Sequence, residues 1–139
     1  MTGGFLRCSA SRDAWFFSML ATQALKPAGS MYGFVAPPRR LYLPAGSKNQ
    51  TEKLQGAVVA FRAVPGMTAE WFQRIVDCHL ARNAALGFSV TDMPYCPLNV
   101  KGTRAKVSST GSGFAVTIES DDPGAAQNVL QRAQALASK

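Results

Sequence analysis

The chain has 139 residues, of which 47% are hydrophobic, and its formal net charge is +7. This length and apolar content fit one domain whose core requires neither a metal nor a disulfide. The charge is uneven, because residues 1–53 hold seven basic and two acidic side chains, whereas residues 54–139 hold eight and six. The basic residues are scattered, and no RNA-binding aromatic motif, zinc-finger spacing or basic helix is present, so nucleic-acid binding is not expected.

Residues 1–55 have the composition of a basic leader that contains glycine and proline. Breakers such as Gly3-Gly4 and Pro37-Pro38 interrupt any helical period. An apolar run from Ala14 to Ala21 follows two arginines, and Thr22-Gln23-Ala24 resembles a signal-peptide cleavage site. If this segment is a signal, the protein is exported or periplasmic. Otherwise it is an organellar or irregular leader, or a segment that folds onto a cytoplasmic domain.

The apolar run is too short for a transmembrane span, which needs about 18 to 20 apolar residues. Two further stretches in this region, Met31 to Ala36 and Arg40 to Leu43, have the composition of short strands. If this region is ordered, we expect them to form an edge pair.

From Gly56 onward the pattern becomes regular, and residues 56–139 form the predicted domain. Residues 57–64 have the length and composition of a strand, which Pro65-Gly66 ends. A helix is predicted next, with Thr68 as its N-cap and with Gly87 as the stop after its last residues. At about 100° per residue its apolar side chains spread over one broad face. These are Trp71, Phe72, Ile75, Val76, Leu80 and Leu86.

A hairpin and a second helix complete the domain. The pattern predicts strands over residues 103–109 and 113–120, joined by a Thr-Gly-Ser-Gly turn. Asp122 is suited to cap the second helix, and Pro123 to occupy its first position, where no amide hydrogen is needed. The buried side of that helix comprises Ala126, Val129, Leu130, Ala133 and Leu136.

The resulting β-α-β-β-α order predicts an α+β fold, with a small antiparallel sheet and two helices packed on one face. Over about residues 57–137 this order resembles part of a ferredoxin-like split unit, which lacks its last strand unless the N-terminal third supplies one. Heavy-metal-associated domains share the broader arrangement. Their Cys-x-x-Cys after the first strand is absent, because Pro65-Gly66-Met67-Thr68 stands there. The resemblance is one of topology.

The only histidine, His79, falls near the middle of the apolar face of the first helix, with Cys78 on its edge. A loop over residues 92–98, restricted by two prolines, carries Met93 and Cys96. Adjacent helical residues point about 100° apart, so one of the helical pair is expected to meet a donor of the loop. The predicted metal ligands are His79, Cys78, Cys96 and Met93.

An imidazole, two thiols and a thioether suit copper or zinc better than calcium or magnesium. A two- or three-coordinate copper(I) site needs fewer ligands than a four-ligand zinc site, so copper is the sharper prediction. The sequence therefore predicts a small soluble binding or accessory domain with a soft-metal site.

Other readings stay open. His79 could be a core residue, with Cys78 and Cys96 joined as a structural disulfide in an oxidising compartment, where the closed loop is worth about 3 kcal/mol. The protein would then be an interaction module that meets an unknown protein partner. The contact would be through the uncovered face of the sheet or through Trp15-Phe16-Phe17. A Cys96–His79 thiol enzyme is less expected, because no third orienting group and no oxyanion donor is identifiable.

Overall fold

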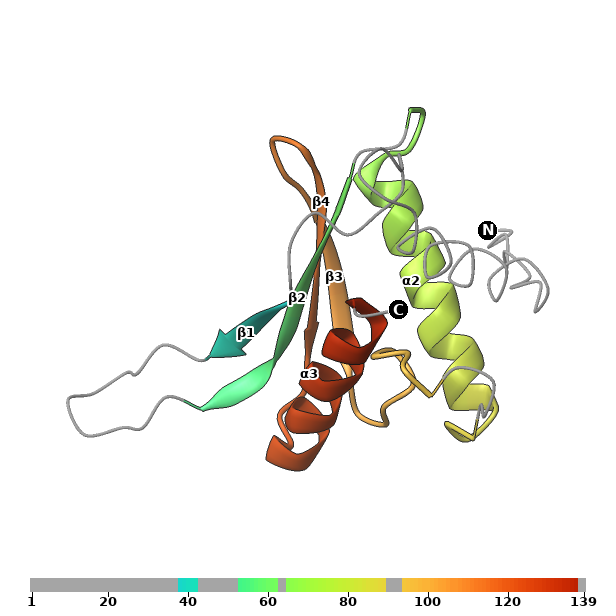
Figure 1. The fold of residues 1–139 in the computed structure, drawn as a ribbon. Helices are drawn as coiled ribbons and strands as arrows, with labels where there is room; N and C mark the ends of the chain where they lie inside the picture. Colours follow the sequence, from blue (N-terminus) through green and yellow to red (C-terminus); the bar gives the residue numbers. More distant parts are fainter. Residues whose placement is uncertain (1–37, 43–52, 63–64, 90–93, 138–139) are drawn as a thin grey trace.

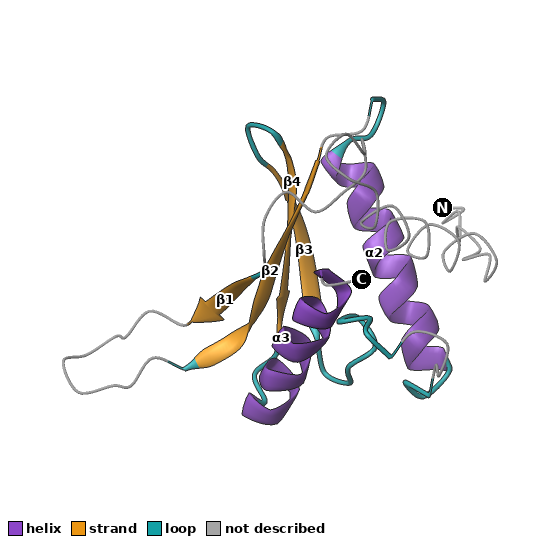
Figure 2. Cartoon of the chain, viewed as in Figure 1, coloured by secondary structure: helices purple, strands orange, loops and turns teal. Residues whose placement is uncertain are grey.

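Four antiparallel strands and two helices make up the part of the chain that the computed structural model describes, residues 38–42, 53–62, 65–89 and 94–137 (Figures 1 and 2). The strands are β1 (Arg39–Tyr42), β2 (Leu54–Arg62), β3 (Arg104–Ser109) and β4 (Gly113–Glu119), and the helices are α2 (Ala69–Ala85) and α3 (Pro123–Ala137). The sheet has the order β1-β2-β4-β3. The predicted α+β class is confirmed.

The local signals explain where the elements begin and end. The Thr68 hydroxyl accepts a hydrogen bond from the amide of Trp71 at 3.2 Å, and the Asp122 carboxylate accepts one from the amide of Ala125 at 2.7 Å. Each satisfies an amide that has no partner within its helix, as an N-cap does. Gly87 lies just beyond α2 with φ of 63°, a conformation that glycine adopts without strain. Both predicted caps and the predicted stop are confirmed.

The N-terminal third supplies the strand that the ferredoxin-like comparison lacked. β1 pairs antiparallel with β2, which pairs antiparallel with β4. β1 thus occupies the edge where a last strand would lie, although it comes first in the sequence. The sheet therefore includes residues that precede Gly56, and β2 itself begins at Leu54. The stretch Met31 to Ala36, expected beside this edge, lies outside the described residues.

The core lies between one face of the sheet and the two helices. Alternate residues of β2 and β4 point to this face and pair across the strands, as Val59 with Val116 and Phe61 with Phe114 do. Phe72 of α2 packs edge-on against both phenylalanines, with ring centroids 5.5 and 5.8 Å away. The two helices cover different parts of the sheet, α3 mainly β2 and α2 mainly β3.

The buried side of α2 is narrower than its apolar pattern predicts. The fully buried residues are Phe72, Val76, His79 and Asn83, which follow one line along the helix. Trp71 and Leu86 were expected on this face but are 46% and 48% exposed. Trp71 lies about 100° around the helix from Phe72, so a sheet that receives Phe72 leaves Trp71 at the side.

Helix α2 also covers the outer edge of β3. The Gln73 side chain accepts a hydrogen bond from the amide of Val107 at 2.6 Å and donates one to the carbonyl of Ala105 at 3.1 Å. These two backbone groups face outward from the edge strand, and one side-chain amide satisfies both. Gln73 thus joins α2 to the edge of the sheet.

Most of the predicted leader lies outside the described residues. This includes the apolar run from Ala14 to Ala21 and the Trp15-Phe16-Phe17 cluster, so the structure does not bear on the proposed signal. Within the described ranges, neither helix combines the length and the apolar character needed to cross a membrane.

Candidate functional site

The segment that precedes β3 runs in the interior, which is unusual for a connecting segment. Residues 96–100 are all buried. Both helices hold their backbone: Asn83 of α2 donates to the carbonyl of Leu98 at 3.0 Å, and Arg132 of α3 donates to the carbonyl of Cys96 at 3.5 Å. The amide of Asn99 donates to the same Cys96 carbonyl at 3.1 Å, closing a turn. These contacts fix the position of the Cys96 side chain.

Cys96 meets His79 beneath this turn. The Cys96 Sγ lies 3.3 Å from the His79 Nε2, and the two residues are 2% and 0% exposed. His79 reaches this position because it follows Phe72 and Val76 along the sheet-facing line of α2. The prediction that one of the helical pair meets a donor of the loop is confirmed for His79 and Cys96.

Burial keeps both members of the pair neutral near pH 7. It lowers the pKa of His79 from 6.5 to about 4, and the positive charge of Arg82 lowers it further. Burial raises the pKa of Cys96 from 9.0 to about 11, against smaller opposing effects of backbone hydrogen bonds and of Arg132. One hydrogen bond therefore joins a neutral thiol and a neutral imidazole. A buried neutral thiol is a poor nucleophile, so the geometry does not favour a thiol enzyme.

Cys78, another predicted donor, is not part of this pair. Cys96 is a free cysteine in the structure, so the Cys78–Cys96 disulfide considered from the sequence is not formed. Cys78 is itself disulfide-bonded, and it lies half-buried about 100° around α2 from His79, on whose face Cys96 packs. Met93 lies outside the described residues. Within the described ranges, no three His, Cys, Asp or Glu side chains come together around one point.

Three polar residues around the pair were not predicted from the sequence. Asn83 lies four residues after His79 on the same line of α2, a spacing that could have marked it as a buried neighbour. Arg82 lies three residues after His79, and Arg132 comes from α3. Helical spacing brings Arg82 close to His79, whereas the contact of Arg132 with Cys96 follows from the packing of α3, which no local pattern reports.

In the metal-free protein we expect acid to destabilise the fold through His79. An unfolded histidine binds a proton as the pH falls below about 6.5, whereas folded His79 resists protonation down to a pH of about 4. Stability is therefore retained above pH 6.5 and decreases below it, by about 3 kcal/mol at pH 4. Urea unfolding at neutral pH and at about pH 4 measures this loss. Between neutral pH and pH 4, the free energy of unfolding of a His79→Gln variant should fall by about 3 kcal/mol less than that of the wild type. An equal fall in both proteins would contradict the lowered pKa of His79.

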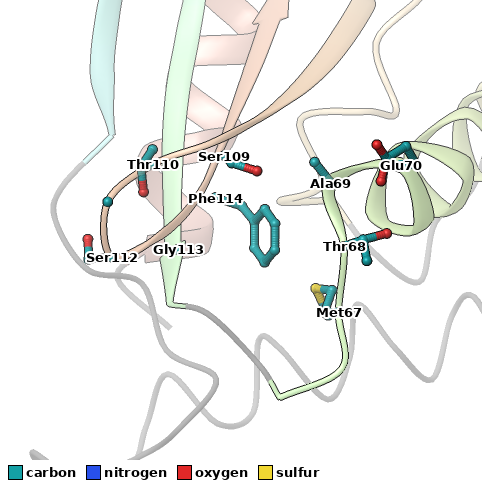
Figure 3. A pocket seen from close by; sticks show the side chains of 10 residues that line it. Met67, Thr68, Ala69, Glu70, Ser109, Thr110, Ser112, Gly113 and Phe114 are labelled. Atoms are coloured by element: carbon teal, nitrogen blue, oxygen red, sulfur yellow. The ribbon is translucent and has the colours of Figure 1, made fainter.

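A second feature, an open hollow, lies at the other end of α2 (Figure 3). Its volume is about 480 Å³, and its walls are the start of α2 and the β3–β4 turn. The Phe114 and Met67 side chains lie between these walls (Figure 3). His79 lies eleven residues beyond Thr68, which is at the rim of the hollow, a distance of about 16 Å along the helix axis. The hollow is therefore separate from the Cys96–His79 pair.

Comparison of the chain with protein-family models, with curated proteins and with solved structures gives no match.

Proposed function

We propose that this protein is a small binding domain that holds one soft metal ion between the Sγ of Cys96 and the Nε2 of His79. The single observation that carries the proposal is the 3.3 Å approach of these two atoms in the interior. Thiolate sulfur and imidazole nitrogen are the donors that copper and zinc take in proteins.

The two donor atoms are spaced for a bent coordination. With metal–sulfur and metal–nitrogen bonds of about 2.3 and 2.0 Å, a tetrahedral angle at the ion separates the donors by about 3.5 Å. A linear arrangement would separate them by about 4.3 Å. From the observed 3.3 Å, a bent site needs an opening of a few tenths of an ångström, and a linear site needs about 1 Å. The proposal is therefore a bent pair that leaves room for a further ligand.

Copper(I) fits the available donors better than zinc. Copper(I) is stable with two or three soft ligands, whereas structural zinc takes four. The described residues bring two donors together. Met93, three residues before Cys96 in the sequence, remains the predicted third ligand, and a Met93→Leu variant tests its contribution.

The surroundings of the pair support a preorganised site. The turn that carries Cys96 is held from α2 by Asn83 and from α3 by Arg132, so the sulfur is positioned before an ion arrives. An ion enters only if the buried 96–100 segment opens, which predicts slow exchange with solvent ions.

Copper(I) titration under reducing conditions tests the proposal. A chromophoric chelator that competes for copper(I) should report one tight equivalent bound to the full chain. Cys96→Ser and His79→Gln should each weaken this equivalent by about 100-fold or more, because each removes one of two donors. Cys78→Ser should change it by less than about threefold, since Cys78 lies about 100° around α2 from His79 and is not part of the pair.

Met67→Leu is the matched control, because it removes a soft sulfur atom at the far end of α2, beside the hollow. Circular dichroism of each variant establishes that the fold is retained. Wild-type affinity in folded Cys96→Ser would overturn the proposal, and so would the absence of bound copper in the wild-type chain.

A further inference from the structure

We infer that this site selects ions by charge and takes a monovalent soft cation in preference to a divalent one, because two arginines flank the Cys96–His79 pair. The inference rests on the proposed function and names the class of ion that the site accepts.

The two arginines approach the pair from different elements. Arg82 lies on α2 one turn beyond His79, and its positive charge lowers the pKa of that ring. Arg132 lies on α3, and its guanidinium donates to the backbone carbonyl of Cys96 itself, at 3.5 Å. The positive charge of Arg132 acts to lower the pKa of the Cys96 thiol, against the larger effect of burial. Both arginine side chains are half-buried, so solvent screens them less than it screens charges at the open surface.

Charge balance then separates the two classes of ion. Without metal, a cysteine thiol carries its proton at pH 7 and is neutral. When a monovalent cation binds, the S–H bond breaks, an S–metal bond forms and the proton leaves to solvent. The thiolate and the ion together are neutral, so the net charge beside the arginines does not change.

A divalent cation makes the same exchange but leaves one positive charge in the interior. That charge is desolvated and is repelled by Arg82 and by Arg132. At an effective dielectric constant of about 20, repulsion between unit charges about 10 Å apart weakens binding on the order of tenfold. Each arginine should thus disfavour a divalent ion by about that factor and leave a monovalent ion nearly unaffected.

Silver(I) and cadmium(II) are suitable probes because they have the same number of electrons and are both soft, so they differ chiefly in charge. Isothermal titration at neutral pH gives the affinity of the full chain for each ion, and the contribution of this site is the part lost in Cys96→Ser. We expect Arg82→Gln to raise cadmium affinity about tenfold and to change silver affinity by less than about threefold. Arg132→Gln also removes the hydrogen bond that holds the Cys96 turn, which weakens both ions alike, so there we expect the ratio of cadmium to silver affinity to rise about tenfold.

Two further variants separate charge from packing. Arg74→Gln removes an exposed arginine from another face of α2 and should change neither affinity. Arg82→Lys keeps the charge and should behave as the wild type. The inference is overturned if both ions bind but the ratio of cadmium to silver affinity is unchanged in the glutamine variants. If neither ion binds in a Cys96-dependent way, the proposed function itself fails.

Discussion

Replacing Gly56 by alanine is expected to lower the free energy of unfolding by about 4 kcal/mol or more, a large share of the stability of a domain of this size. Gly56 has a φ of 152° and sits in the middle of the sheet, where β2 pairs with Leu41 on one side and Glu119 on the other. A Cβ there would lie 2.0 Å from the carbonyl oxygen of Ile118. Backbone cannot move aside as a flexible side chain can, so the strand pairing would have to change.

The glycine also marks an irregularity in the sheet. Leu41 pairs with Gly56, but the next residue of β1, Tyr42, pairs with Leu54, so one residue of β2 is passed over. A glycine at such a bulge supplies a backbone conformation that other residues reach only under strain. Urea unfolding measures the loss. Gly111→Ala is the matched control, because a Cβ at Gly111 would have nothing within 4 Å, and it should change stability by less than about 1 kcal/mol.

Truncation of Phe72 to alanine is expected to destabilise the fold by about 3 to 5 kcal/mol. The residue is 1% exposed and packs edge-on against Phe61 and Phe114, with ring planes inclined at 88° and 71°. Its loss would remove a ring that joins α2 to both central strands and would leave a cavity among aromatic side chains.

The neighbouring Trp71→Ala provides the comparison, since a larger side chain is removed from a position that is 46% exposed. We expect it to cost about 1 kcal/mol. Equal losses at the two positions would show that α2 does not face the sheet along the line of Phe72. Thermal and urea unfolding followed by circular dichroism gives both values.

The helices and strands of this fold can be predicted from the sequence where neighbouring residues determine their ends. Thr68, Asp122 and Pro123 place the helix starts within one residue. Thr68 and Asp122 each accept from an amide that has no helical partner, and Pro123 has no amide hydrogen that would need one. The position of β1 is not local. More than ten residues connect β1 to β2. The four residues of β1, Arg39–Tyr42, carry no pattern that predicts which strand they pair with.

The candidate site was predictable in part for the same reason. The helical period of α2 fixes where His79 points, and the proline-flanked loop is short enough to return Cys96 to it. The period also predicted a wide apolar face with Trp71 on it, whereas the sheet receives one line of residues that includes the polar Asn83. Arg132 belongs to another helix, and its contact with the Cys96 carbonyl depends on tertiary packing alone.

The central claim is that the buried sulfur of Cys96 and the ring nitrogen of His79 share one ion. X-ray absorption at the copper edge, on the full chain loaded with one equivalent of copper(I), tests it most directly. We expect a first shell with one imidazole nitrogen and at least one sulfur, and the outer-shell pattern of an imidazole ring that disappears in His79→Gln. A shell of sulfur atoms alone, or of oxygen and nitrogen alone, would contradict it.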